Sequence, residues 1–116
     1  MTANTPRSRQ NKGALFQKKI AKQFADTFNL SFGRDEDFFG RQMGGIGTDI
    51  VMSKEAKNKC IFDIECKKQE KWNVPEWWKQ AVANTAKNRA PLLVISKNRH
   101  ETLAILRLED LLKLLK

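Results

Sequence analysis

Three polar side chains occupy every second position in the segment CIFDIECKK, residues 60–68. Because side chains alternate between the two faces of a β-strand, Asp63, Glu65 and Lys67 would share one face, opposite an apolar one. Asp49 lies at the start of the neighbouring β-rich run TDIVMS, just after a glycine-rich stretch, so its carboxylate can approach Glu65 across the strand pair. From spacing alone, this polar face is either the solvent side of a half-buried hairpin or a site that binds a ligand.

Two carboxylates that converge on one point repel each other unless a cation lies between them. Magnesium suits such a pair because it takes a few carboxylate oxygens and keeps several waters. A metal held in this way activates a bound water and neutralises charge that develops on a phosphate, and a nearby lysine stabilises the same charge. Asp49, Glu65 and Lys67 therefore indicate the chemistry of phosphodiester hydrolysis.

The apolar pattern predicts the elements that would position these groups. An amphipathic helix is expected over 13–28, followed by a glycine-bearing loop over 29–47 with a short strand near 38–43. We expect strands at 48–53, 60–68, 91–96 and 102–106, helices from Pro75 to about residue 88 and over 108–115, and turns at 54–59, 72–75 and 97–101. This order predicts an α/β fold with a mixed central sheet flanked by helices.

Length and composition set the class of protein. The 116 residues suit a single domain, which we place at 13–116 behind a flexible basic arm over 1–12. No apolar run approaches the roughly 20 residues of a membrane span, and the polar N-terminus lacks a signal-peptide core, so a cytoplasmic protein without a membrane partner is expected. Cys60 and Cys66 are expected to be small buried side chains, and with His100 as the one histidine no thiolate zinc site is expected.

The charge distribution points to a polyanionic partner. The net charge is +9, and residues 1–24 carry six lysines or arginines and no acidic residue. Phosphate neutralisation would then supply much of the binding affinity, although a merely soluble basic surface has the same composition. The candidate phosphate contacts are Arg7, Arg9, Lys12, Lys18, Arg41, Lys68 and Lys71.

The stretch GTDIVMS…IFDIECKKQEKW…WWKQA resembles the PD-(D/E)xK nuclease superfamily, whose D…ExK core lies on a restriction-endonuclease-like αβββαβ fold. The resemblance covers nearly the whole chain, and its GxD and IECK elements look most similar to those of small Holliday-junction resolvases of the archaeal and bacteriophage type. It implies that Asp49 and Glu65 bind Mg²⁺, for which Mn²⁺ can substitute, that the Cys66 carbonyl is a further ligand and that Lys67 is the catalytic lysine. It also implies that Gln80 is a polar residue beside the active site.

The first helix departs from that pattern. Many resolvases carry a metal-binding glutamate there, whereas the segment KGALFQKKI has Gln17 at the matching place. Because a neutral glutamine binds magnesium less strongly, the site would hold one metal firmly or bind a second only with DNA present. Alternatively, Glu36 or Asp37 from the following loop would supply the missing charge.

The remaining motifs have plainer interpretations. GRQMGGIGTD lacks the strand, the helix and the GK[ST] of a phosphate-binding loop, so no nucleotide cofactor is expected, and its glycines would let DNA approach Asp49 closely. Core packing is expected for three tryptophans, with a dimer interface or DNA stacking as alternatives. Core packing is also expected for the C-terminal leucines. The one histidine is expected to be exposed. These residues are Trp72, Trp77 and Trp78, Leu108, Leu111, Leu112 and Leu115, and His100.

The leading hypothesis is a magnesium-dependent endonuclease, and the resemblance to resolvases implies that it recognises branched DNA by its shape. The resemblance also implies a homodimer, because a two-fold symmetric four-way junction needs paired cuts. A second hypothesis keeps the chemistry and changes the substrate to duplex, nicked or flapped DNA, as in restriction or repair. A third is a non-catalytic DNA-binding relative. The intact Asp49, Glu65 and Lys67 speak against the third, and the missing first-helix glutamate speaks for it.

Overall fold

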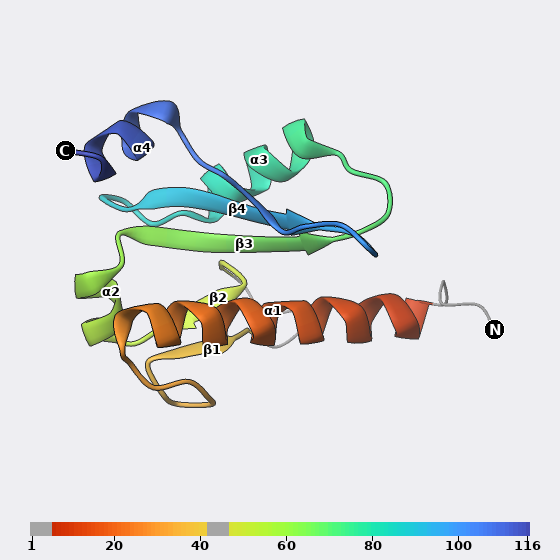
Figure 1. The fold of residues 1–116 in the computed structure, drawn as a ribbon, viewed down its shortest axis with the longest axis horizontal. Helices are drawn as coiled ribbons and strands as arrows, with labels where there is room; N and C mark the ends of the chain where they lie inside the picture. Colours follow the sequence, from red (N-terminus) through yellow and green to blue (C-terminus); the bar gives the residue numbers. More distant parts are fainter. Residues whose placement is uncertain (1–5, 42–46) are drawn as a thin grey trace.

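The computed structural model describes residues 6–41 and 47–116, with side chains from residue 12 onward within these ranges. Two groups of strands lie at its centre (Figure 1). β3 (Phe62–Lys68) and β4 (Ala90–Ser96) are parallel, and β5 (Leu103–Ile105) pairs with β4 in the antiparallel sense. β1 (Phe38–Gly40) and β2 (Ile50–Met52) form a separate antiparallel pair that packs beside β3.

Helices cover both sides of the strands. α1 (Pro6–Phe28) runs along one side of β3, whereas α3 (Val74–Asn84) and α4 (Leu108–Leu114) lie on the other, and the short α2 (Lys54–Lys59) joins β2 to β3 (Figure 1). This arrangement confirms the predicted mixed sheet flanked by helices and is compatible with a restriction-endonuclease-like fold. Within the described part of the chain, no helix has both the length and the apolar character needed to cross a membrane.

The apolar core is divided into two clusters, one on each side of β3 and β4. The larger cluster lies towards α1 and includes Ile20, Phe38 and Ile64. The smaller lies under α3 and includes Trp77 and Leu93. β4 is buried along its whole length, as its continuous apolar sequence predicts, because it has a strand on each side and a cluster on each face.

β3 is buried on both faces, which removes one of the two interpretations of its polar positions. Asp63 is 6% exposed and Glu65 is 4% exposed, so their face is not the solvent side of a hairpin. α3 packs against β3 and covers this face, while Ile64 and Cys66 face the larger cluster. The alternating side chains of β3 therefore enter two packed layers: an apolar one towards α1 and a polar one under α3.

Three boundaries differ from the predicted ones. α1 begins at Pro6 rather than at residue 13, so 6–12 are helical, and 1–5, the rest of the predicted basic arm, lie outside the described residues. Proline suits the first turn of a helix because its missing N–H has no partner there. Residues 54–59 form a helix instead of a turn, because the Ser53 hydroxyl accepts the N–H of Ala56 and caps it. α3 ends at Asn84, about one turn earlier than predicted.

The closing helix exposes the leucines that were predicted to pack in the core. Leu108, Leu111, Leu112 and Leu115 are 69%, 38%, 49% and 73% exposed, so that prediction is wrong. α4 is only seven residues long and follows β5, which lies at the edge of its sheet. Its buried residue is Asp110, and the helix therefore contributes little to the apolar core.

Candidate active site

Asp49 is fixed against the edge of β3 by backbone hydrogen bonds. Its N–H donates to the carbonyl of Ile64 at 3.1 Å, and its carboxylate Oδ2 accepts the N–H of Cys66 at 2.8 Å. Its own carbonyl accepts the N–H of Arg41 at 2.7 Å. The segment before β2 thus lies alongside β3 and holds the Asp49 carboxylate beside residues 64–66.

The side chain of Arg41 supports this segment from the other side. Its Nε donates to the Thr48 carbonyl at 2.7 Å, so Arg41, predicted as a phosphate contact, holds the chain next to Asp49. Gly47 has a φ of +108°, which L side chains rarely adopt, and a Cβ there would lie 3.0 Å from Nη2 of Arg41. Gly44 and Gly45, which were predicted to let DNA approach closely, lie outside the described residues.

Glu65 lies near Asp49 on the face of β3 that α3 covers. Asn84, the last residue of α3, donates from Nδ2 to Oε1 of Glu65 at 3.2 Å. Burial, together with the negative charge of Asp49, raises the pKa of Glu65 from 4.5 to about 7. Burial also raises the pKa of Asp49, although the Cys66 N–H and the positive charge of Lys67 oppose that shift. Both carboxyl groups therefore occupy surroundings that disfavour their negative charge.

Lys67 and the backbone of Cys66 complete this group. The positive charge of Lys67 lowers the pKa of both carboxyl groups, so the lysine lies within electrostatic reach of each. The N–H and the carbonyl of one strand residue face the same neighbour, so the Cys66 carbonyl also faces the edge where Asp49 lies. Cys60 and Cys66 are buried and free, as predicted, and burial raises the pKa of each thiol.

The donor atoms gathered here fit a hard divalent cation. Two carboxylates and one backbone carbonyl give an all-oxygen set, which magnesium accepts together with water. No three His, Cys, Asp or Glu side chains come close enough to form a metal site anywhere in 6–41 or 47–116. A metal at Asp49 and Glu65 would therefore depend on the Cys66 carbonyl and on water or substrate oxygens to complete its shell.

The other acidic candidates and Gln17 have different placements. Gln17 is 8% exposed and packs against Gly40, where an added Cβ would lie 3.2 Å from the Gln17 Cβ. Because Gly40 pairs with Ile50, Gln17 lies close to the strand that follows Asp49. Asp37 does not join the site, since its carboxylate accepts hydrogen bonds from Ser31 and Ser53 beyond the opposite end of β2, and Glu36 is exposed in the same loop. Neither supplies the charge that Gln17 lacks.

Gln80 is exposed on α3, one turn before Asn84. Residues four apart on a helix share a face, so both amides lie along one line, but the hydrogen bond to Glu65 comes from Asn84. The sequence analysis did not single out Asn84, because the predicted helix ran on to about residue 88 and placed Asn84 in its interior. In the structure α3 ends at Asn84. The i, i+4 spacing of two amides after the ExK strand is the signal that could have identified it.

Asp63, the third polar residue of the face, has a structural partner. Its Oδ1 accepts a hydrogen bond from Nε of Arg89 at 2.6 Å, and its Oδ2 accepts the N–H of Ala86 at 2.9 Å. Arg89 also donates to the carbonyls of Cys60 and Phe62 at 2.7 and 2.9 Å. This buried pair joins the turn after α3 to the start of β3, and it does not take part in the group around Glu65.

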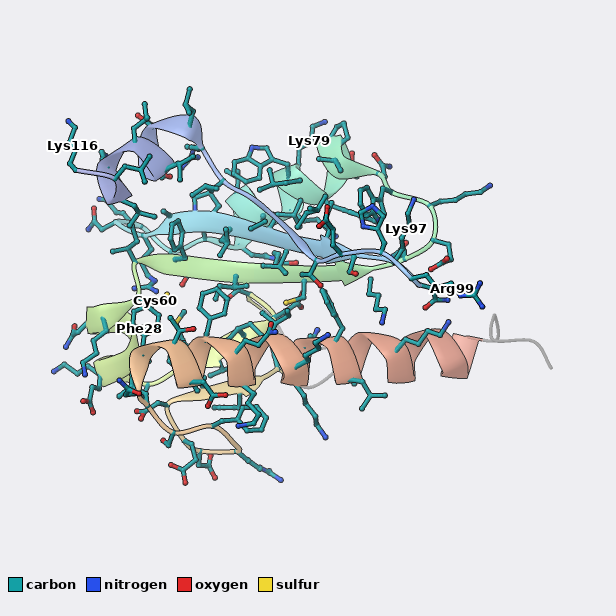
Figure 2. All side chains as sticks on the ribbon, in the orientation of Figure 1. Phe28, Cys60, Lys79, Lys97, Arg99 and Lys116 are labelled. Carbon is teal, nitrogen blue, oxygen red and sulfur yellow. The ribbon has the colours of Figure 1, made fainter. Side chains whose placement is uncertain are left out.

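The predicted phosphate contacts outside the site differ in how far they are exposed to solvent. Lys18 and Lys71 are exposed, while Lys12 and Lys68 are half-buried. Figure 2 shows the basic side chains spread over α1 and over the end of the sheet where β3 finishes. The side chains of Arg7 and Arg9 lie outside the described ones.

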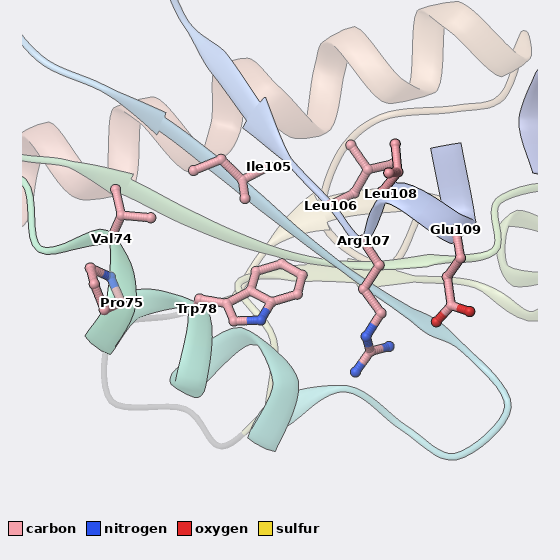
Figure 3. Close-up of a pocket in the computed structure, with 8 residues that line it drawn as sticks. All are labelled: Val74, Pro75, Trp78, Ile105, Leu106, Arg107, Leu108 and Glu109. Carbon is pink, nitrogen blue, oxygen red and sulfur yellow. The ribbon is translucent and has the colours of Figure 1, made fainter. Parts of the chain in front are cut away.

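A pocket of about 640 Å³ lies elsewhere, between the start of α3, β5 and the start of α4 (Figure 3). Trp78 and Ile105 line it together with Arg107, and none of the residues grouped around Asp49 does. Trp77 is buried as predicted, and Trp72 and Trp78 are partly buried against the same cluster. The candidate catalytic residues Asp49, Glu65 and Lys67 thus lie at the edge of β3 and not in this pocket.

A comparison with protein families gives one match. The family model described as "Phage putative PDDEXK endonuclease" matches residues 8–116, which is nearly the whole chain. Neither the curated proteins nor the solved structures contain a match to this chain.

Proposed function

Because the chain belongs to the phage PDDEXK endonuclease family, we propose that it is a magnesium-dependent, structure-specific DNA endonuclease that cuts branched DNA as a homodimer. The observation that carries the proposal is the pairing of Asp49 and Glu65 beside Lys67, with a pKa of Glu65 raised to about 7 by burial and by Asp49. Such a pair is unfavourable alone and favourable around a cation. Mn²⁺ is expected to substitute for Mg²⁺.

In this mechanism the chain's own residues hold the reacting groups in place. Asp49, Glu65 and the Cys66 carbonyl would bind the metal, which supplies an activated water and neutralises the phosphate. The N–H of Cys66 fixes one oxygen of Asp49, and the amide of Asn84 fixes one oxygen of Glu65. Lys67 would stabilise the negative charge that develops on the phosphate oxygens.

Branched DNA as the substrate rests on shape and symmetry. The basic residues of α1 and of the end of β3 suit phosphates, which position a protein without reading sequence. A four-way junction has two-fold symmetry, so paired cuts need two active sites related by the same symmetry. Phage-encoded members would act in the host-cell cytoplasm.

One assay tests the reaction and the substrate together. The protein is incubated with a synthetic four-way junction, a flap and plain duplex, in Mg²⁺, Mn²⁺ or EDTA, and its mass in solution is measured by light scattering. Symmetric nicks in the junction, no cutting in EDTA and the mass of two chains are expected. Cutting of plain duplex at an equal rate would overturn the junction as the substrate and favour a restriction-like or repair-like nuclease. A monomer that makes paired cuts would refute the dimer.

Two variants test the assigned roles. Asp49→Asn and Lys67→Ala should each lower cleavage by about a hundredfold or more while junction binding persists. Asp35→Asn is a matched control, because Asp35 is exposed and its φ of +64° suits asparagine equally well. Binding without cleavage by the unmodified chain, in both Mg²⁺ and Mn²⁺, would favour the non-catalytic relative, which the buried and neutral Gln17 beside β1 supports.

A further inference from the structure

The turn between β4 and β5 carries basic side chains that the proposed mechanism does not use. Lys97 and Arg99 lie in this turn, which follows β4 directly (Figure 2). In the parallel register Lys67 pairs with Ile95, so Lys97 is two residues beyond the level of the catalytic lysine. By strand alternation Lys97 leaves β4 on the same face as Ile95, which is the face that carries Glu65 and Lys67.

The turn is held in a defined shape by the chain around it. The Ser96 hydroxyl, 4% exposed, donates to the carbonyl of His100 at 3.2 Å, and the N–H of His100 donates to the carbonyl of Lys97 at 3.2 Å. The N–H of Asn98 donates to the carboxylate of Glu70 at 2.9 Å. These bonds join the turn to the segment that follows β3.

Trp72 lies at the centre of this arrangement. Its Nε1 donates to the carbonyl of Ser96 at 3.2 Å, the ammonium of Lys97 lies 4.9 Å from its ring centroid, and the ring of His100 meets it edge-on at 4.8 Å. With these neighbours around it, the indole is poorly placed to stack on a DNA base. Instead, the indole holds the ammonium group of Lys97 in place through a cation–π contact.

We propose that the β4–β5 turn binds the DNA backbone beside the scissile phosphate, through Lys97 and Arg99, and that Trp72 is a positioning residue for it. The proposal rests on the nuclease function proposed above. Two residues of strand rise and one strand spacing put Lys97 about 8 Å from Lys67, backbone to backbone. That distance spans about two phosphates of a DNA strand, whose charges recur about every 3.4 Å along the axis.

The local charge balance supports a phosphate as the ligand. Lys68 and Lys71 precede Trp72 on the adjoining segment, so four basic residues gather at this end of the sheet. The acidic residues in these two segments are Glu70, whose carboxylate accepts the Asn98 N–H, and Glu101, which follows the turn. Arg99 is exposed in a left-handed backbone conformation, with φ of +58°, at the tip of the turn.

The test compares two double variants that remove the same charge. Lys97→Ala with Arg99→Ala removes the turn's charges, and Lys113→Ala with Lys116→Ala removes two exposed charges at the far end of the molecule, where Figure 2 shows Lys116. The dissociation constant for a four-way junction is measured by fluorescence anisotropy in EDTA at several salt concentrations. The turn variant should bind about tenfold more weakly or worse, with a salt slope shallower by one to two, since each phosphate contact contributes about 0.9.

The control variant should keep nearly the full affinity and slope. Equal losses in the two variants would mean a general charge effect and would overturn the proposal, as would no loss in either. Trp72→Ala should reproduce much of the slope change at a temperature where circular dichroism shows the variant still folded, whereas Trp72→Phe should retain most of the slope because its ring still faces Lys97. Equal slopes for these two variants would refute the positioning role.

The outcome is independent of cleavage. If the unmodified chain binds the junction but does not cut it in Mg²⁺, the nuclease function fails while the salt slopes still decide the role of the turn. If the turn variant matches the control while the unmodified chain cuts DNA, the inference about the turn fails alone. A chain that binds no DNA at any salt concentration overturns both.

Discussion

Replacing Glu65 by glutamine should make the metal-free protein more stable at neutral and alkaline pH. Glu65 is 4% exposed, and the pKa of its carboxyl group is raised from 4.5 to about 7, first by burial and then by the charge of Asp49. Because the pKa in the folded state exceeds the unfolded value, folding favours the protonated form. The resulting stability is fully present below pH 4.5 and is lost as the pH rises through about 7.

The magnitude follows from that pKa difference. At about 1.4 kcal/mol per pH unit, ionised Glu65 lowers the free energy of unfolding by about 3 kcal/mol above pH 7. Glutamine has the same shape, keeps an oxygen that can accept the Asn84 hydrogen bond and carries no charge. Glu65→Gln should therefore gain about 3 kcal/mol over the unmodified chain at pH 8 and almost nothing at pH 4.5, while cleavage is lost.

Urea unfolding in EDTA at pH 4.5, 6 and 8 measures this difference directly. Glu76→Gln is the control, because Glu76 is exposed in the first turn of α3 and its substitution removes one carboxylate without emptying a buried site, so its effect at pH 8 should stay far below that of Glu65→Gln. A Glu65→Gln variant that is less stable than the unmodified chain at pH 8, or one whose advantage is the same at every pH, would refute the electrostatic reasoning.

Three further outcomes are expected. Asp63→Ala leaves the guanidinium of Arg89 buried without its carboxylate and should lower the free energy of unfolding by about 3–5 kcal/mol, as read from urea midpoints; a loss below about 1 kcal/mol would show that the pair is not effectively buried. Asn84→Ala removes the hydrogen bond that favours ionised Glu65, so the acid limb of the pH profile of kcat/KM should move to higher pH, and an unmoved limb would exclude Asn84 from the site. Mg²⁺ should raise the melting temperature more at pH 8 than at pH 5.5, because metal must displace the proton held by Glu65, and calorimetry showing the opposite order would contradict the ligand assignment.

The strands were predictable because their signal is local. The continuous apolar run of β4 marks a strand buried on both faces, and the structure buries all of it. The alternation over residues 60–68 correctly groups Asp63 and Glu65 on one face. It cannot tell whether that face meets water or a helix, because the answer depends on where α3 packs after the chain has turned back.

The finer features of the site depend on contacts between distant segments. Asn84 reaches Glu65 only because α3 runs back over β3, and Arg89 meets Asp63 for the same reason. Arg89 carries no signal in its own neighbourhood, and the local signal for Asn84 is only its i, i+4 spacing from Gln80, since polar residues at helix ends usually face water. The exposure of the α4 leucines also depends on distant contacts. Their helical spacing is that of a buried apolar stripe, but no other element in the described part of the chain packs over them to bury it.

The hydrogen bond from the Cys66 N–H to Asp49 has a practical consequence for spectroscopy. The donor is a backbone amide within β3, and its acceptor is an oxygen of a candidate metal ligand. Any change in the charge on that carboxylate alters the shielding of this one amide proton. A ¹⁵N-labelled sample would therefore report occupancy of the site through the resonance of Cys66, with no added probe and no DNA present.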